Sequence, residues 1–374
     1  MAELRYNPVS MEWVMVASHR QKRPQMPQGW CPFCPGSGRV PDGGYTTLRY
    51  QNDFPALSTS PPQPDDVSGL FFRTRPAYGR CEVLLYSDAH DATLAGLPDA
   101  QAHELASMWR DCYADMAADP GIEYVFIFEN KGEVVGVTMP HPHGQAYGYS
   151  FIPKKVESEL IGAVAFCDKH GGACLHCALL SEELRDGRRV IFENDHFVAF
   201  VPFFSPITYG AHVMAKRHVP HLAAMDSAEL RALGETLRDC AGMYDAVFGA
   251  PFPYMMCMFN APTPAAQNSL RNLRGALCSL SPFDALGAFG SASPLDIVSP
   301  FDALGAFGPP SPSDLSNSFD AYCHFHVKFF PPMRTPDTQQ FFASSETGAG
   351  AWCNPNCPEE KAAELRAAYR RFKA

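Results

Sequence analysis

The residues best suited to chemistry in this chain form one pentapeptide, His141-Pro142-His143-Gly144-Gln145. A neutral imidazole can attack phosphorus near neutral pH because its lone pair is already nucleophilic. The glycine lets the backbone approach a ligand closely, and the glutamine amide can donate hydrogen bonds to phosphate oxygens without exchanging a proton. A bare His-x-His also occurs in metal sites and edge strands, so it is the whole pentapeptide that predicts a phosphate-handling site.

The features around the pentapeptide occur twice along the chain. The interval from His90 to Arg110 equals that from His218 to Arg238, at 20 residues. Matched features in one order indicate an internal duplication. The first copy runs through Cys31-x-x-Cys34, Asn52-Asp53, His90, Tyr124, Asn130 and His141-x-His143, and the second through Cys174-x-x-Cys177, Asn194-Asp195, His218, Tyr254, Asn260 and His324-x-His326.

Hydrophobic patterns predict the same elements in each copy. Runs rich in Val, Ile, Phe and Tyr predict strands at 81–87, 124–130, 212–218 and 254–260. Helical periodicity predicts helices at 99–118 and 226–248, the second with Ser227 as its N-cap. The expected fold class is therefore α+β, with two tandem halves that each hold a sheet with helices packed on one face.

One interval departs from the duplication. Asn130 and His141 are 11 residues apart, whereas Asn260 and His324 are 64 apart. The extra residues are rich in Ser, Pro, Gly and Ala, and SPFDALGAFG occurs at both 281–290 and 299–308. This composition predicts a poorly ordered inserted loop at about 263–320. A functional lid is the alternative interpretation.

The repeated Cys-x-x-Cys pairs indicate metal sites, because this turn places two thiolates on one tetrahedral centre. The duplication supplies two histidines to each pair. The predicted zinc ligands are Cys31, Cys34, His90 and His141 in the first half, and Cys174, Cys177, His218 and His324 in the second. Four protein ligands leave no open position, so both sites would be structural. The alternative is that the cysteines are simply buried and the histidines solvated. With His141 on zinc, His143 remains for chemistry.

Composition limits the class of partner and the compartment. The net charge is -10 and the pI is about 5.7, which argues against a general nucleic-acid or anionic-membrane partner. The sequence lacks a long apolar run, and its N-terminus does not resemble a secretory signal. Thirteen cysteines in such a chain favour metal ligands and free thiols over disulfides, so we expect a cytoplasmic protein.

Taken together, the motifs resemble the galactose-1-phosphate uridylyltransferase family of the histidine-triad superfamily. The likeness extends over nearly the whole chain except about 263–320. It rests on CPFC (31–34), FENKG (128–132), the pentapeptide, KRHVP (216–220) and SSETGAG (344–350), among other segments. The resemblance implies two histidine-triad-like halves, which we place at 1–165, with the catalytic pentapeptide, and 166–374.

The resemblance also implies a reaction and its site. His143 would attack the α-phosphorus of UDP-glucose and expel glucose 1-phosphate, and galactose 1-phosphate would then take the uridylyl group in a ping-pong exchange. Gln145 would steady the phosphoryl oxygens and favour transfer over hydrolysis. The implied substrate contacts are Arg20, Arg23, Val40, Asn52, Asp53, Asn130, Gly136, Thr138, Gln145 and Glu346, the last contributed across a homodimer.

The chain departs from the family pattern at a second metal site that some members build from one glutamate and three histidines. Glu159 and His326 match two of those positions, but Phe259 and Lys328 occupy the others. A phenyl ring cannot ligate and an ammonium repels a cation, so we expect no iron-type metal there. Gln340 replaces a lysine found near the sugar phosphate in some members, which predicts weaker substrate binding.

Two other functions fit the same residues. A related nucleotidyltransferase or phosphorylase would use another nucleotide sugar or free phosphate, and a test of nucleotide and acceptor range would distinguish it. A non-catalytic zinc-binding scaffold would never form a labelled protein with α-labelled UDP-glucose.

Overall fold

The computed structural model describes residues 2–22, 29–65, 67, 69–280 and 318–374. The strands are β1 (Ala2–Asn7), β2 (Glu12–Ala17), β3 (Leu48–Gln51), β4 (Thr74–Pro76), β5 (Gly79–Leu85), β6 (Tyr124–Lys131), β7 (His143–Tyr149), β8 (Val190–Glu193), β9 (Phe197–Phe200), β10 (Ala211–Ala215), β11 (Tyr254–Phe259), β12 (His326–Phe330), β13 (Met333–Thr335) and β14 (Thr338–Gln339). The α-helices are α1 (Asp99–Ala117), α2 (Lys154–Lys169), α3 (Leu175–Asp186), α4 (Ser227–Phe248), α5 (Gln267–Leu280) and α6 (Pro358–Lys373).

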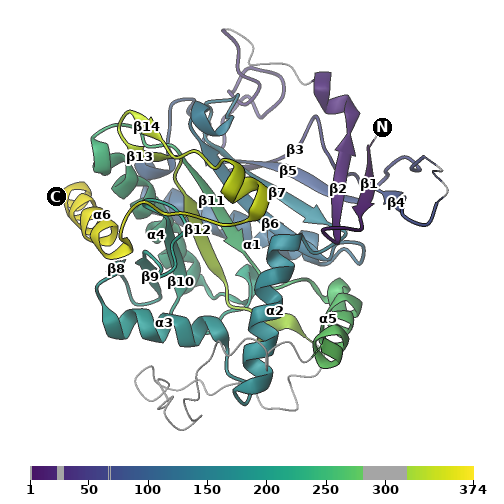
Figure 1. Cartoon of the computed structure of the whole chain (residues 1–374). Coiled ribbons are helices and arrows are strands. Elements are labelled where there is room, and N and C mark those ends of the chain that lie inside the picture. Colours follow the sequence, from purple (N-terminus) through teal and green to yellow (C-terminus); the bar gives the residue numbers. More distant parts are fainter. Residues whose placement is uncertain (1, 23–28, 66, 68, 281–317) are drawn as a thin grey trace.

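The centre of the molecule is one nine-stranded antiparallel sheet in the order β3-β5-β7-β6-β11-β12-β10-β9-β8 (Figure 1). The two halves meet where β6 pairs with β11, with Tyr254 opposite Lys131. This pairing satisfies backbone groups that two separate sheets would expose at their edges. The expected α+β class is confirmed, and the two expected sheets are joined into one.

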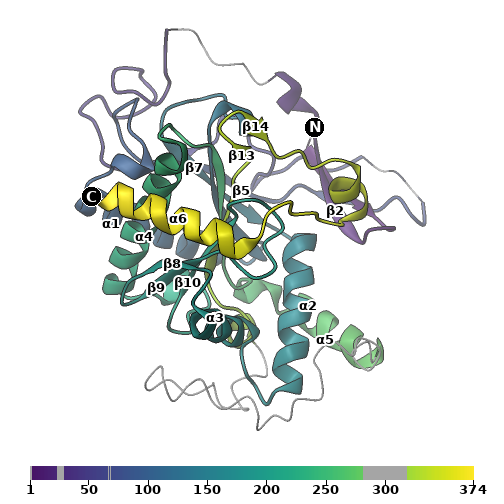
Figure 2. The same cartoon turned by 60° about the vertical axis from the view of Figure 1, so that its left-hand side comes forward.

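Helices cover both faces of this sheet, not one face as the sequence predicted. On β6, Val125 and Ile127 pack into the core with α1 and α4, whereas Tyr124 and Phe126 pack on the opposite side with α2. Figure 2 shows α4 and α6 on one side of the sheet and α2 and α5 on the other. The central strands are therefore buried on both faces, which a simple alternation of apolar and polar residues does not reveal.

Helix α4 begins at a capping box, and the N-cap was predicted one residue too late. The side chain of Asp226 accepts hydrogen bonds from the backbone of Ala228 and Glu229, and the Glu229 side chain accepts from the backbone N–H of Asp226. Asp226 rather than Ser227 is therefore the N-cap, because it satisfies the amides that the first turn leaves unpaired.

The segment expected to be an inserted loop is helical in its first part. Residues 264–266 form a 3-10 turn and 267–280 form α5, with Ala266 and Leu270 buried against α2. The prediction of a loop is wrong for this stretch, since its apolar side chains find a partner in α2. Both copies of SPFDALGAFG lie outside the described residues. The predicted boundary between the halves, at 165/166, falls within α2 and stays a prediction.

The strand pairing relates β11 to β6 with a shift of one residue from the match that the sequence suggested. In the first half, Glu129 lies opposite Gly144, the residue after His143. In the second half, Met258 lies opposite Val327, the residue after His326. Met258 is therefore the counterpart of Glu129. Asn130 therefore corresponds to Phe259, not to Asn260. A shift of one residue places a side chain on the other face of a sheet, so Asn260 does not repeat the position of Asn130.

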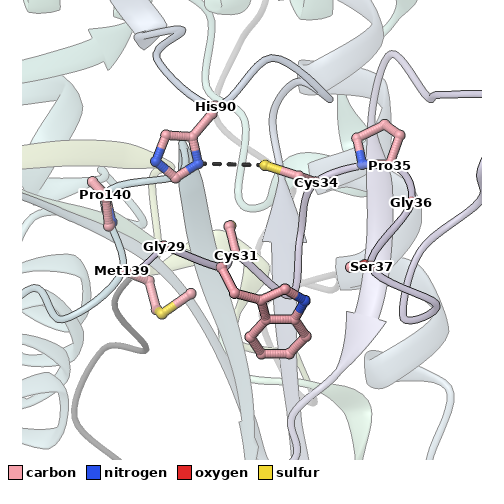
Figure 3. A pocket seen from close by; sticks show the side chains of 10 residues that line it. Gly29, Cys31, Cys34, Pro35, Gly36, Ser37, His90, Met139 and Pro140 are labelled. Carbon is pink, nitrogen blue, oxygen red and sulfur yellow. Dashed lines mark hydrogen bonds between the residues drawn. The ribbon is translucent and has the colours of Figure 1, made fainter.

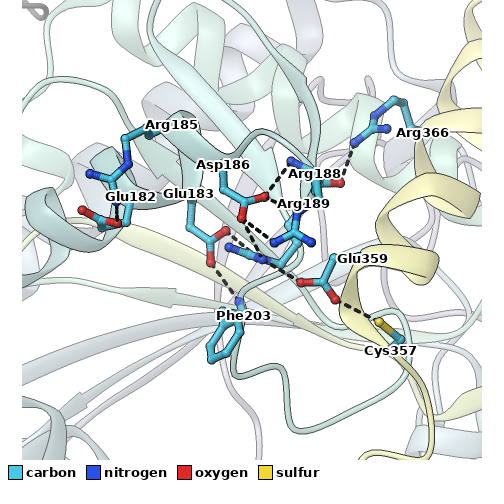
Figure 4. A network of polar contacts seen from close by, with 10 residues as sticks. All are labelled: Glu182, Glu183, Arg185, Asp186, Arg188, Arg189, Phe203, Cys357, Glu359 and Arg366. Carbon is cyan, nitrogen blue, oxygen red and sulfur yellow. Dashed lines mark hydrogen bonds and ion pairs between the residues drawn. The ribbon is translucent and has the colours of Figure 1, made fainter. Parts of the chain in front are cut away.

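A largely buried ion-pair network fastens α6 to the second half (Figure 4). The Arg189 guanidinium, only 6% exposed, lies 2.7 Å from Glu183 of α3 and 2.6 Å from Glu359 of α6. The Arg366 side chain donates to the carbonyl of Val190 on β8 at 3.0 Å. Because a buried guanidinium must be paired, these contacts fix the orientation of α6 on the edge of the sheet.

Candidate active site and metal centres

The last three residues of the pentapeptide begin strand β7, which is an inner strand of the first half of the sheet. Side chains alternate along a strand, so His143 and Gln145 share the face on which α2 lies, and Ala146 points into the core with α1. Strand β7 lies between β5 and β6, with Leu85 opposite His143. Pairing on both sides holds His143 on a rigid support, as a reacting group requires.

The imidazole of His143 is oriented by a backbone carbonyl two residues earlier. Its Nδ1 lies 2.8 Å from the carbonyl oxygen of His141, which can only accept, so Nδ1 carries the proton and donates. This assignment of the tautomer places the lone pair on Nε2. The Tyr147 hydroxyl donates to Oε1 of Gln145 at 3.3 Å, which orients the amide so that its NH₂ group is a donor. The two side chains thus supply a nucleophile and a hydrogen-bond donor.

The structure brings together all four predicted ligands of the first metal centre, Cys31, Cys34, His90 and His141, with ligand atoms within 4.8 Å of one another. The Cys34 sulfur lies 3.4 Å from Nδ1 of His90 (Figure 3) and 3.7 Å from Nδ1 of His141. A tetrahedral zinc ion has S···N edges of about 3.6 Å, so the donor set fits. Nε2 of His141 donates to the carbonyl of Ser87 at 2.7 Å, which turns Nδ1 toward the sulfurs.

The second set, Cys174, Cys177, His218 and His324, converges in the same way. The Cys177 sulfur lies 3.4 Å from Nδ1 of His218 and 3.2 Å from Nδ1 of His324. Nε2 of His324 donates to the carbonyl of Ala215 at 2.8 Å, as His141 does in the first half. Both halves therefore contain a Cys₂His₂ group able to hold a metal ion, and each group includes the first histidine of its His-x-His.

Two cavities border the pentapeptide. One of about 600 Å³ opens onto the first metal centre and is lined by Trp30, Cys34, His90 and Met139, among others (Figure 3). A second of about 220 Å³ is lined by Asn130, Met139 and the segment His141–His143. His143 therefore lies beside a space large enough for part of a ligand, while His141 is buried.

Three predicted substrate contacts lie at the end of β6 and in the connection from β6 to β7. Asn130 lines the smaller cavity together with His143. Gly136 has a positive φ of 81°, a conformation that favours glycine and turns the chain back toward the pentapeptide. Thr138 is exposed between Val137 and Met139, which both line that cavity.

Other predicted contacts lie over β3 and β5 on the same face. Val40 is buried with Phe33 and Val83, and the Phe33 ring centroid is 5.9 Å from that of His143. The carboxylate of Asp53 accepts from the Tyr50 hydroxyl at 3.1 Å.

The side chains of Asn52 and Arg20 complete this group. Oδ1 of Asn52 caps a turn by accepting from the backbone of Phe54. Burial raises the pKa of the Cys81 thiol on β5, and the positive charge of Arg20 opposes that rise, which places Arg20 near the same face. Arg23 lies outside the described residues.

Glu346 and Gln340 lie on the C-terminal segment. Glu346 is half-buried in a short helix, η9 (Ser344–Gly348), and accepts from the backbone of Ala343 at 3.1 Å. Gln340 is occupied by backbone groups: its Oε1 accepts from Thr208 and its Nε2 donates to the carbonyls of Thr208 and Pro331. The Gln340 side chain therefore fastens β14 to the loop before β10.

The second His-x-His is built like the first but is closed. Nδ1 of His326 donates to the carbonyl of His324 at 2.8 Å, yet the ring is 4% exposed and stacks on Phe259 at 4.9 Å. Lys328 lies 2.6 Å from Glu159 and 4.2 Å from the Phe259 ring centroid. Lys328 thus occupies the side of His326 where Gln145 lies in the first half.

Sequence reasoning missed three residues around these sites. His176 joins Glu159 and His326 in a third group of possible ligands; it escaped notice because it stands between the cysteines of Cys-x-x-Cys. Lys328 forms an ion pair with the Glu159 carboxylate. The expected absence of an iron-type metal at this group stays a prediction. Tyr45 lies 3.0 Å from Nε2 of His141 and donates to the carbonyl of Phe33. Glu129 lies within FENKG (128–132), and the motif alone assigned it no role.

Comparisons with known proteins agree with this geometry. Residues 1–153 match the model of the galactose-1-phosphate uridyl transferase N-terminal domain, and residues 162–274 match that of its C-terminal domain. The galactose-1-phosphate uridylyltransferase of Thermotoga maritima is 34% identical over 98% of both chains. The chain belongs to the galactose-1-phosphate uridylyltransferase family.

Solved structures support the family assignment. A uridylyltransferase structure matches 99% of both chains with a TM-score of 0.77 and 26% identity. An ADP-glucose phosphorylase from Arabidopsis thaliana, at 22% identity and a TM-score of 0.65, shares the fold. Membership in this family of nucleotidyltransferases favours an enzyme over a non-catalytic scaffold. Among the described residues, we find no helix with the length and apolar character needed to span a bilayer.

Proposed function

We propose that this chain transfers a uridylyl group between UDP-glucose and galactose 1-phosphate, yielding UDP-galactose and glucose 1-phosphate in the Leloir pathway. The observation that carries the proposal is the hydrogen bond from Nδ1 of His143 to the carbonyl of His141, which leaves Nε2 free to react in a residue that lines a cavity of about 220 Å³. The 34% identity to a uridylyltransferase over 98% of both chains favours this reaction over that of a phosphorylase. We expect the reaction to take place in the cytoplasm.

The exchange proceeds in two displacements at the same phosphorus. Nε2 of His143 forms a bond to the α-phosphorus of UDP-glucose, and the bond to the bridging oxygen breaks, so that glucose 1-phosphate leaves with the electron pair. A phosphate oxygen of galactose 1-phosphate then attacks the same phosphorus and releases Nε2. Two similar steps replace one difficult transfer.

Gln145 assists both steps without supplying a proton. Its NH₂ group is oriented by the Tyr147 hydroxyl and lies on the same face as His143. A neutral amide donor can stabilise charge on the nonbridging oxygens. It cannot act as an acid or base for an attacking water, which favours transfer over hydrolysis.

The remaining predicted contacts fit a nucleotide lying across β3, β5 and β7. Val40 packs on the His143 face and Arg20 acts on Cys81 of β5, while Asn130 lines the cavity beside His143 and Thr138 lies between two other residues that line it. Arg20 and Arg23 would pair with the phosphates. The arrangement supports a site that spans uracil, ribose and phosphates.

Zinc in both Cys₂His₂ centres would be structural. In the first half it would bind His141 and thereby fix the carbonyl that orients His143. Elemental analysis of the purified protein should find about two equivalents per chain. One equivalent would contradict the second site.

We further propose a homodimer in which Glu346 contacts the hexose bound to the other subunit. A mixture of His143→Asn and Glu346→Gln subunits tests this, because half of the hybrid's sites would contain both intact residues. Activity of the mixture well above that of either variant alone supports the proposal. A monomer in light scattering, or no gain on mixing, contradicts it.

A labelling experiment tests the function itself. Incubation with α-³²P UDP-glucose should give an acid-labile, base-stable label that galactose 1-phosphate discharges. His143→Asn should remove the label, and His326→Asn, the matched change in the second half, should keep it. Label that persists without His143 contradicts the assignment. Faster labelling by ADP-glucose than by UDP-glucose, or discharge by inorganic phosphate alone, would indicate the related phosphorylase.

A further inference from the structure

We propose that Glu129 is a positioning residue for the uridylyl transfer: its carboxylate lies behind the strand that carries His143 and balances the positive charge that this imidazole acquires. The inference rests on the proposed function, since it needs His143 to be the nucleophile. It assigns a role to a buried carboxyl group on the face opposite the reacting side chains.

The position of Glu129 follows from the sheet. It lies directly opposite Gly144, the residue after His143, on the neighbouring strand. Its side chain is 6% exposed, and its Oε1 accepts from the Tyr254 hydroxyl at 3.2 Å. Its Oε2 makes no hydrogen bond of normal geometry among the described residues, although the nearby Tyr86 side chain lowers the pKa of Glu129. Glu129 and His143 line the same 220 Å³ cavity. A buried oxygen without a partner is costly, so its retention needs a reason.

Tyr86 connects this carboxyl group to the pentapeptide. The backbone N–H of Tyr86 donates to the carbonyl of Pro142 at 3.0 Å. A Cβ atom placed on Gly144 would lie only 2.3 Å from the Tyr86 hydroxyl oxygen. The glycine is therefore needed for the phenol to lie under the strand, and the pentapeptide rests on a polar layer formed by Glu129, Tyr86 and Tyr254.

The second half has apolar residues at the positions that form this polar layer in the first half. With His326 matched to His143, the register places Met258 at the position of Glu129, Val327 at that of Gly144, and Ala215 at that of Tyr86. All three are buried and apolar. Removal of the phenol makes room for the valine side chain, so the replacements fit one another. The half with the closed histidine has an ordinary apolar core where the other half keeps a carboxyl group.

The proposed chemistry gives the carboxylate a purpose. When Nε2 of His143 bonds to phosphorus, the proton on Nδ1 stays in place, so the ring of the intermediate carries a positive charge. A carboxylate on the next strand stabilises that charge, and the low-dielectric surroundings strengthen the interaction. The carboxylate stabilises the uncharged ring of the free enzyme less than the charged ring. It therefore increases the rate of uridylylation more than the affinity for UDP-glucose.

The state of Glu129 depends on pH in the working range. Burial raises the pKa of Glu129 to about 7, opposed by Lys131, Tyr254 and Tyr86 and reinforced by Asp245 of α4. These are the charged and titratable groups that face it from β6, β11, the end of β5 and α4. The carboxylate therefore forms as pH rises through about 7. Because the usual pKa of a glutamate is 4.5, the stabilising effect of the protonated carboxyl group is lost as pH rises from 4.5 to about 7.

Glu129→Gln tests the inference, since it keeps the shape and removes the charge. At about pH 8 the single-turnover rate of uridylylation should fall on the order of 10- to 50-fold, with little change in the UDP-glucose concentration that gives half the maximal rate. Toward about pH 6 the difference from the parent protein should shrink, because Glu129 is then protonated there as well. Glu129→Asp should restore part of the rate.

Two further variants separate this role from a structural one. Glu129→Gln should melt no lower than the parent at about pH 8, because it removes a buried charge. Met258→Gln, the matched change in the second half, should lower the melting temperature and leave the pH profile unaltered. Tyr86→Phe removes a group that lowers the pKa of Glu129, so it should move the rate increase to higher pH.

The outcomes distinguish this inference from the function beneath it. A parent protein that never acquires label contradicts the proposed function. A label that forms equally fast in Glu129→Gln at every pH, or a rate loss independent of pH that parallels a loss of stability, overturns only the role of Glu129. If Glu129→Gln fails to fold, an unchanged pH profile in Tyr86→Phe overturns it instead.

Discussion

The two halves of this molecule place the same histidine in two different environments. His143 and His326 each donate from Nδ1 to the carbonyl of the histidine two residues earlier, at 2.8 Å in both cases. His143 borders a cavity and is followed by Gln145 on the same face, whereas His326 is buried against Phe259 and faces Lys328. The orientation of the imidazole is thus a property of the fold, and access and neighbouring charge decide whether it can react.

The largest expected difference concerns the two histidines themselves. His143→Asn should reduce uridylyl transfer by more than about 10³-fold, because the covalent route is lost. His326→Asn should change the rate by less than about 3-fold. Steady-state kinetics with both variants checks this. A comparable loss in both would show that the second half takes part in the chemistry.

Changes to the predicted metal ligands should produce a smaller difference in transfer rate between the two halves. His141→Ala should lose one zinc equivalent and on the order of 10²-fold in transfer rate, because His141 both binds the metal and orients His143. His324→Ala should lose the other equivalent and mainly lower the melting temperature. Metal analysis and kinetics on the same samples provide the measurement. Equal rate losses would mean that zinc acts on overall stability alone.

The ion pair that closes the second site should contribute to stability and not to turnover. Lys328→Met leaves Glu159 without its partner and should lower the free energy of unfolding by about 1–3 kcal/mol, since Glu159 keeps some solvent. The double variant with Glu159→Gln should recover much of this loss. Urea unfolding of the two variants measures the coupling. An additive double variant would contradict a direct pair.

The smallest effect tests the start of α4 in the second half. Asp226→Ala should cost about 1 kcal/mol because two amides of the first turn lose their acceptor. Ser227→Ala should change the stability by less than about 0.5 kcal/mol. Thermal unfolding of the pair decides between the two N-caps. The reverse order would restore the prediction made from the sequence.

Local spacing made the two convergent Cys₂His₂ groups predictable. Cys-x-x-Cys and His-x-His fix the separation of ligand atoms within a few residues, and the duplication supplied the distant partners. The continuous sheet was not predictable in this way, because the pairing of β6 with β11 depends on edges far apart in the sequence. Nor was the offset between Asn130 and Asn260, since identity of letters carries no information on register.

The residues that were missed or misjudged depend on long-range contacts. The expectation that Gln340 weakens substrate binding stays a prediction, whereas the binding of its amide to backbone groups of residues 208 and 331 could not be read from the sequence. His176 and Glu129 acquire meaning only when α3 and β6 lie beside the two His-x-His segments. The sequence predicted the chemistry of the site, and packing distinguishes His143, which lines a cavity, from His326, which is buried.

The most direct test of the assignment of chemistry to the first half is the number and location of uridylyl groups in the trapped intermediate. The protein should be reacted with UDP-glucose, freed of glucose 1-phosphate, digested under basic conditions and analysed by mass spectrometry. We expect one uridylyl group per chain, on the peptide that contains His143. A uridylyl group on the peptide that contains His326, or on both peptides, would contradict the account.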